Sequence, residues 1–172
     1  LSDVNLPLVG TVGEYAFANC QSLSEISLPQ ARQIGEHAFD NCNKLSSVEL
    51  PAAQSLDYFV FQNCTRLTSV SLPSAVSVCL SSFYRCKNLE EVFLPNVEEV
   101  YFNKALKNGK IYIGSTVQEI NFQVVPTRME NGETQNIHEK HDIEIVLDSN
   151  GTYAESVLLT LEEVVRNPEE YG

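Results

Sequence analysis

The chain has 172 residues, of which 43% are hydrophobic and 20% charged, so it can bury the core of a folded domain and is not a disordered chain. Its 11 basic and 23 acidic residues give a formal net charge of −12, which argues against nucleic acids and anionic membranes as partners, because both attract basic surfaces. No apolar run approaches the roughly 20 residues that span a bilayer. The chain begins at Leu1 in mid-pattern, without an initiator Met or a secretory leader, so we expect a processed form.

A repeat of 22 residues dominates the sequence. Leu-Pro dipeptides, single phenylalanines and single cysteines all recur at this interval. They are Leu6-Pro7, Leu28-Pro29, Leu50-Pro51, Leu72-Pro73 and Leu94-Pro95; Phe17, Phe39, Phe61 and Phe83; and Cys20, Cys42, Cys64 and Cys86. One unit has too few apolar side chains to close its own core, so stacked units must bury each row of equivalent residues against the next coil. The repeat therefore predicts a solenoid.

Each unit divides into two halves. In the first half, Ile26 and Leu28 lie two residues apart, as on one face of a short strand, and the proline that follows cannot donate to a strand ladder. In the second half, Ala38, Phe39 and Cys42 follow at spacings of three and four, which favours a short helical turn. The expected fold class is an α/β solenoid, with a parallel sheet on one face and short helical turns on the other.

The pattern LxxIxLPxAxxIGxxAFxNCxx, which residues 23–44 follow, resembles the BspA-like leucine-rich repeat. The resemblance covers residues 1–120, about five repeats. It implies a curved, right-handed leucine-rich-repeat coil, as in bacterial and some protozoal surface proteins, and therefore an extracellular or cell-surface location. It also implies adhesion or protein binding rather than catalysis, and it supplies no ligand-contact residues to carry over to this chain.

The repeat weakens toward its end. Cys79 stands where Gly13 and Gly35 stand in earlier units. The strand expected at residues 110–114 arrives about three residues early and lacks the proline. Terminal coils of solenoids drift in this way because one of their faces has no neighbour to match.

Residues 121–172 are expected to form an acidic C-terminal capping segment with 11 acidic and 3 basic residues. Turns are predicted at 130–133 and 148–151, and a strand at 142–147. A capping box of Thr152 and Glu155 opens a predicted amphipathic helix over 153–166. This helix either covers the open end of the solenoid or binds a partner. The negative charge favours solubility, with steering of a basic partner as the alternative.

The cysteines are expected to form a row of buried thiols, because zinc needs ligands that converge and a linear row does not converge. His37 occupies a variable repeat position, which suggests the surface. His138 and His141, with Asp142 and Glu144 nearby, form either a weak metal site or, as we favour, a solvated turn. No cofactor or metal is expected, and no catalytic motif is present, so the chain is not predicted to be an enzyme.

Removing the core rows leaves a predicted strand face of short polar side chains as the binding face. It comprises Glu25, Ser27, Ser47, Glu49, Ser69, Ser71, Glu91 and Phe93. Tyr58, Phe59 and Tyr84 are predicted exposed aromatics, with packing over neighbouring coils as the alternative. The predicted function is a non-enzymatic protein-binding or adhesion module of a bacterial surface or secreted protein, with a host extracellular-matrix or surface protein as ligand. The alternatives are a structural spacer that displays another domain and, less favoured, a hydrolase-like enzyme using the tail carboxylates and histidines.

Overall fold

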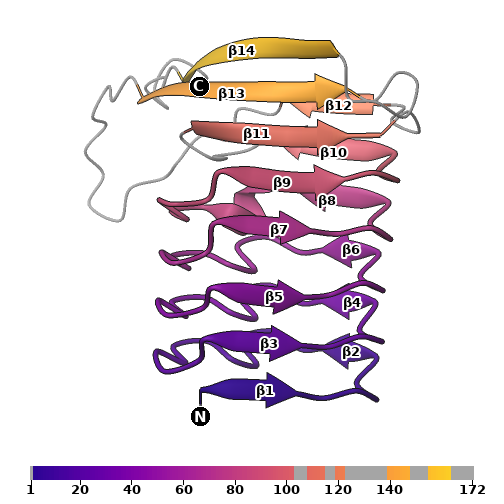
Figure 1. Ribbon diagram of the computed structural model, residues 1–172, viewed down its shortest axis with the longest axis vertical. Coiled ribbons are helices and arrows are strands. Elements are labelled where there is room, and N and C mark those ends of the chain that lie inside the picture. The colour runs from indigo at the N-terminus through magenta and orange to yellow at the C-terminus, as the bar shows by residue number, and fades with distance from the viewer. Residues whose placement is uncertain (1, 103–107, 115–118, 123–138, 148–154, 164–172) are drawn as a thin grey trace, which may run out of the picture.

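A computed structural model describes residues 2–102, 108–114, 119–122, 139–147 and 155–163 (Figure 1). The chain winds through successive coils, and each coil adds one strand to a first strand column and one to a second. The first column contains β1 (Asp3–Asn5), β3 (Glu25–Ser27), β5 (Ser47–Glu49), β7 (Ser69–Ser71), β9 (Glu91–Leu94) and β11 (Asn108–Ile113). The second contains β2 (Thr11–Val12), β4 (Gln33–Ile34), β6 (Ser55–Leu56), β8 (Ser77–Cys79), β10 (Glu99–Phe102) and β12 (Glu119–Phe122). Neighbouring strands within each column are parallel, so the predicted solenoid is confirmed.

The core lies between the two strand columns and consists of the rows that repeat every 22 residues. The rings of Phe17, Phe39, Phe61 and Phe83 stack nearly parallel, with centroid separations of 5.3, 5.3 and 5.7 Å. Backbone hydrogen bonds tie the same positions together, because the Phe39 N–H donates to the Val60 carbonyl at 2.8 Å and the Phe61 N–H to the Ser82 carbonyl at 2.7 Å. Each coil therefore completes the core of the coil before it.

The side of each coil that was expected to be helical instead contains short strands and turns. The second strand column, which was not predicted, forms a single six-stranded sheet. Among the described residues the one helical element is a 3-10 helix, η1 (Leu80–Phe83). Tyr15, His37 and Phe59 have φ values of 54°, 55° and 58°, and a left-handed residue cannot continue a right-handed helix. In the fourth coil the buried Ser81 replaces the aromatic residue, and η1 forms there.

The predicted parallel strands on this face are present, but the first strand column is divided into two sheets. β1, β3 and β5 form a three-stranded sheet, and β7 begins a separate five-stranded sheet. Val48 in β5 is accordingly only half-buried, whereas the equivalent Ile26 and Val70 are buried. The second column runs without a break past the same position, since β6 pairs with β8.

The fifth coil, from β9 to β11, is shorter than the coils before it. Glu91 pairs with Lys110, 19 residues further along the chain, whereas Ser69 pairs with Glu91 at the full 22. The predicted early arrival of this strand is therefore confirmed. Gly114 takes the place of Pro95, and its N–H donates to the Leu94 carbonyl at 3.2 Å. A side chain on Gly114 would collide with the Pro95 backbone, which explains the glycine.

Two long strands continue the first column beyond β11 (Figure 1). β13 (Glu139–Leu147) is parallel to β11, and β14 (Glu155–Glu163) is antiparallel to β13. The predicted strand at 142–147 is thus confirmed, and it begins earlier, at Glu139.

The helix predicted over 153–166 is wrong, because residues 155–163 are a strand. Nine residues of β14 pair with β13, and this pairing satisfies the free backbone edge that β13 would otherwise present. The β-branched Val157 and Thr160 favour a strand, and the apolar spacing that suggested a helix is overridden by tertiary pairing.

Some predictions lie outside the described residues, namely the turns at 130–133 and 148–151 and the residue His138. Within the described part of the chain, no helix has the length and apolar character that crossing a membrane requires.

Candidate functional site

The sheet face comprises the outward-pointing side chains of the first strand column. These are Asp3, Asn5, Glu25, Ser27, Ser47, Glu49, Ser69, Ser71, Glu91, Phe93, Lys110 and Tyr112. All eight residues predicted for the binding face are among them. The strand register sorts the eight into two rows, one with Glu25, Ser47, Ser69 and Glu91, and the other with Ser27, Glu49, Ser71 and Phe93. Because β5 and β7 do not pair, each row consists of two halves.

The N-terminal half of the sheet face is polar and acidic. Glu25, Ser47 and Glu49 are exposed. The Ser27 hydroxyl donates to Glu49 Oε2 at 2.6 Å, which links β3 to β5 through their side chains. With Asp3, Glu25 and Glu49 and no basic residue, this half presents a negative potential to a ligand.

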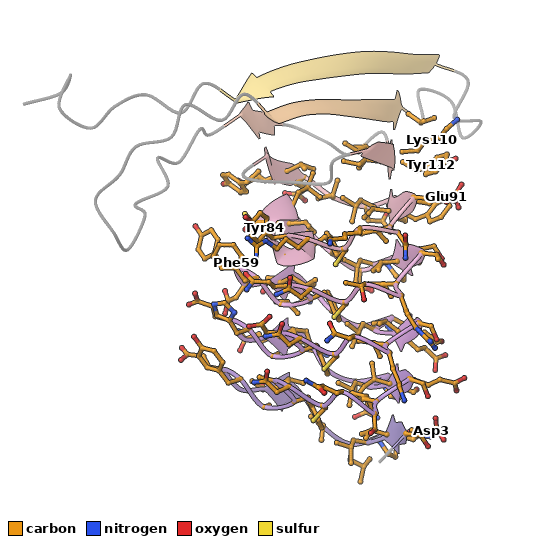
Figure 2. The ribbon with its side chains drawn as sticks, turned by 90° about the vertical axis from the view of Figure 1, so that its left-hand side faces the viewer. Asp3, Phe59, Tyr84, Glu91, Lys110 and Tyr112 are labelled. Carbon is orange, nitrogen blue, oxygen red and sulfur yellow. The ribbon has the colours of Figure 1, made fainter. Side chains whose placement is uncertain are left out.

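The C-terminal half is aromatic as well as charged. The Phe93 and Tyr112 rings stack at a centroid distance of 4.4 Å with an interplanar angle of 8°. The Tyr112 hydroxyl donates to Glu91 Oε1 at 3.2 Å, and Lys110 pairs with Glu91 across the two strands. Glu91, Lys110 and Tyr112 lie on the same side of the molecule (Figure 2).

Sequence reasoning missed Lys110 and Tyr112 as members of this face. The fifth coil, from β9 to β11, is three residues short, so a fixed interval of 22 does not place residues 110–114 beside residues 91–95. Aligning the two segments with a deletion of three residues superposes Tyr112 on Phe93, which would have found the pair.

A second cluster, which we call the aromatic edge, lies on the other side of the solenoid from Glu91 and Tyr112 (Figure 2). It comprises Tyr15, His37, Tyr58, Phe59, Tyr84 and Arg85. Of the three predicted exposed aromatics, Tyr58 is 52% exposed, whereas Phe59 and Tyr84 are half-buried.

The expectation that His37 lies on the surface is met only in part. Its side chain is only 16% exposed. It is stacked between Tyr15 at 4.8 Å and Phe59 at 5.3 Å. Residues at this repeat position vary in identity, but all three are flat rings, and this shared shape is the feature that could have indicated stacking.

The cysteines form the predicted row of buried thiols over three coils. The Cys42, Cys64 and Cys86 thiols donate to the carbonyls of Phe17, Phe39 and Phe61 at 3.1, 3.2 and 2.9 Å. Burial raises the pKa of Cys42 to about 11 and that of Cys86 to about 12, and it raises the pKa of Cys64 further. These thiols are therefore protonated near neutral pH, and since nucleophiles and metal ligands are thiolates, their role is structural.

The part of the chain that the structure describes contains no group of residues that supports the metal-site or hydrolase alternative. Among those residues, no three His, Cys, Asp or Glu side chains are grouped to hold a metal ion. His141 lies in β13, and both its side chain and His138 fall outside what is described. These two alternatives stay predictions.

A family model for the BspA type leucine rich repeat region matches residues 1–125 in six copies. The chain belongs to the BspA-type leucine-rich repeat family. Six copies agree with six strands in each strand column. This is one more than the five repeats that the sequence pattern marks, because the sixth coil lacks the Leu-Pro, phenylalanine and cysteine residues.

Two crystal structures are similar to this BspA-type chain. A leucine-rich repeat protein of T. pallidum is 26% identical, with a TM-score of 0.52 over 64% of this chain and 72% of that chain. A leucine-rich cell surface protein of Faecalibacterium prausnitzii A2-165 is 26% identical, with a TM-score of 0.63 over 87% of this chain and 40% of that chain. This chain thus spans less than half of the second protein. No curated protein matches it.

Proposed function

We propose that this BspA-type leucine-rich repeat chain is a non-enzymatic protein-binding module of a bacterial cell-surface or secreted protein, and that it binds its ligand through the sheet face. The observation that carries the proposal is the register of the first strand column. It aligns outward side chains from three successive coils in each half of the sheet face, so that each of the two rows has an N-terminal and a C-terminal half. An extended, regular display of this kind suits a protein ligand better than a small molecule, which needs a concave pocket.

The two halves of the sheet face supply different parts of binding. The acidic N-terminal half attracts a basic patch on the ligand and raises the association rate. The stacked pair of Phe93 and Tyr112 supplies a flat apolar surface of the kind that anchors interfaces. The proposed ligand is a host extracellular-matrix or surface protein with a basic patch.

The chemistry of the described residues supports binding rather than catalysis. The buried thiols are held protonated, and nucleophilic catalysis needs a thiolate or an activated hydroxyl. The carboxylates of the N-terminal half are exposed on a flat sheet, whereas general acids are tuned by burial.

The test is binding of the chain to a panel of immobilised, purified extracellular-matrix and host surface proteins, measured by biolayer interferometry. The double variant Glu25→Lys/Glu49→Lys and the single variant Phe93→Ala should each weaken binding by about tenfold or more. The matched control Gln33→Lys/Ser55→Lys places the same lysines at exposed positions of the second strand column and should change affinity by less than about twofold.

Equal loss in the control and sheet-face variants would contradict the proposal. Absence of any partner up to about 100 µM would favour the spacer alternative instead.

A further inference from the structure

We propose that the aromatic edge is a second interaction surface, independent of the sheet face, and that it binds a lysine- or arginine-bearing segment of a protein partner. The aromatic edge lies on the turns that follow β2, β4, β6 and β8, away from the sheet face (Figure 2). It does not contribute its rings to the phenylalanine row of the core.

The backbone holds the edge rings in an uncommon conformation. Tyr15, His37 and Phe59 adopt left-handed φ values, which bulky residues rarely do. The neighbouring coils fix this conformation, because the Tyr15 N–H donates to the Glu36 carbonyl at 3.0 Å and the His37 N–H to the Tyr58 carbonyl at 3.2 Å. The stacked rings of Tyr15, His37 and Phe59 are thus in place before any partner arrives, so ordering them costs little conformational entropy on binding.

The regular ring stack ends between the third and fourth coils. The fourth coil has Ser81 at the ring position, buried within η1, so no further ring stacks on Phe59. Tyr84 instead approaches Phe59 edge-on, at 6.0 Å and 70°, and Tyr58 is tilted against Phe59 at 6.5 Å and 44°. Three inclined rings therefore meet here, and the Tyr58 ring remains largely exposed.

The charges around these rings favour a cation. Glu36 occupies in the second coil the position that Tyr58 occupies in the third, and the register of β4 with β6 places the two positions side by side. Glu36 Oε1 lies 3.6 Å from His37 Nε2, and the Glu36 side chain is still 44% exposed, so a ligand can reach its carboxylate. Asp57, next to Tyr58 in the chain, is exposed as well. A cationic side chain can place its charge between these carboxylates and its alkyl stem along the Tyr58 ring.

The same part of the edge already holds one guanidinium on a ring. Arg85 Cζ lies 5.1 Å from the Tyr84 ring centroid, within the range of cation–π attraction. A partner arginine on Tyr58 would repeat this arrangement one coil earlier. An acidic partner fits less well because Glu36 and Asp57 would repel it. A purely apolar partner also fits less well because it would desolvate these carboxylates without pairing them.

The experiment uses three fluorescein-labelled dodecapeptides, alternating Gly-Arg, Gly-Lys and Gly-Glu, titrated with the full chain by fluorescence anisotropy. Backbone amide shifts of the ¹⁵N-labelled chain locate the bound peptide. We expect the two basic peptides to bind, the acidic peptide not to bind, and the largest shifts to fall on residues 36–37 and 57–59. Tyr58→Ala and Glu36→Gln should each raise the Kd by about 3- to 10-fold.

The matched control is Glu98→Gln, which removes the same charge from an exposed position outside both proposed surfaces and should change the Kd by less than about twofold. Far-UV circular dichroism checks that each variant folds, and the exposed Tyr58 and Glu36 side chains make this the expected result. Equal effects of Glu36→Gln and Glu98→Gln, shifts spread over all acidic residues, or no binding of either basic peptide would each overturn the proposal. Concentration-dependent shifts at residues 57–59 without peptide would assign the edge to a second copy of the chain and would overturn it too.

Loss of matrix-protein binding in the sheet-face variants with unchanged peptide binding would leave this proposal intact. The two proposals therefore fail separately.

Discussion

The first three coils and the later coils of the solenoid bury the same rows of residues, but the first three are more regular in repeat interval, strand length and ring stacking. Coils one to three keep the interval of 22 residues, strands of two or three residues and a nearly parallel ring stack at the aromatic edge. At the fourth coil the first strand column divides, η1 replaces the left-handed turn and Tyr84 meets Phe59 edge-on. Beyond it the strands lengthen to between four and nine residues.

Successive coils are held together by the rows of buried side chains and not by the side chains on the surface. Val78 pairs with Val100 at the full interval of 22 residues and Leu94 with Ile113 at 19, and all four are fully buried although the second interval is shorter. The exposed side chains, in contrast, differ before and after the boundary between the third and fourth coils. Both proposed interaction surfaces change character there, since the sheet face becomes aromatic beyond β7 and the ring stack of the aromatic edge ends at Phe59.

The largest expected effect comes from the phenylalanine row, which crosses the boundary between the two regions. Phe39→Ala and Phe61→Ala should each lower the free energy of unfolding by about 3–5 kcal/mol, because each ring is fully buried between two others. Urea denaturation measures both. A loss for Phe61→Ala that is smaller by more than about 1.5 kcal/mol would show that the core is interrupted at the fourth coil. Phe17→Ala, at a half-buried ring with one stacking neighbour, is the control and should cost less.

The close approach between regular coils can be tested at a glycine. A Cβ on Gly35 would lie 2.8 Å from the Glu14 backbone nitrogen, so Gly35→Ala must push two coils apart and should cost about 1–3 kcal/mol. Gly13 occupies the equivalent position in the first coil, and a Cβ there has no neighbour within 4 Å. Gly13→Ala is therefore the matched control and should cost under about 0.5 kcal/mol in the same denaturation assay. Equal costs would contradict the coil spacing.

The thiol row predicts alkaline instability that spans both regions. Burial raises the folded-state pKa of Cys42, in the second coil, to about 11 and that of Cys86, in the fourth, to about 12, from the ordinary thiol value of 9.0. A raised pKa means that the folded state binds the proton more tightly, so stability is constant below about pH 9 and falls as the pH rises toward 11 and 12. Thermal unfolding followed from pH 7 to 11 checks this.

The control for the alkaline experiment is Cys42→Ala. Between pH 9 and 11 its stability should fall less steeply than that of the wild type, by up to about 1.4 kcal/mol per pH unit, because one fewer proton is released on unfolding. The same slope in both proteins would mean that Cys42 is not buried as a neutral thiol.

The smallest expected effect lies on the sheet face. Ser27→Ala removes the hydrogen bond to Glu49, and Ser71→Ala removes an exposed hydroxyl in the second half of the face. Both should change the free energy of unfolding by less than about 0.5 kcal/mol, since exposed polar contacts contribute little. A cost above about 1.5 kcal/mol for Ser27→Ala would make the link between β3 and β5 a structural element rather than a part of the display.

The sequence alone predicts the rows that face the core, because burial imposes the same residue at every coil. It therefore indicates the solenoid, the thiol row and the membership of Glu25 through Phe93 in one face. It does not predict features that depend on backbone detail, such as the left-handed turns at Tyr15 and His37, which side-chain spacing alone presents as helical.

The tail shows the other limit of sequence reasoning. Residues 155–163 have helical apolar spacing, yet the open edge of β13 selects a strand. The apolar spacing within one segment does not indicate which strand edge will lie beside that segment in the fold. The pairing of Phe93 with Tyr112 was missed for a related reason, since the shortened fifth coil breaks the interval by which equivalent residues were recognised.

The stacking of like residues across coils is tested most directly by alkylating the native chain with iodoacetamide and measuring each cysteine by mass spectrometry. Cys20 is exposed in the first coil, whereas Cys42, Cys64 and Cys86 are buried in one row with raised pKa values. We expect Cys20 to react under native conditions and the other three to react only after unfolding in urea. Reaction of Cys42 and Cys64 at the rate of Cys20 in the native protein would contradict the stacked solenoid.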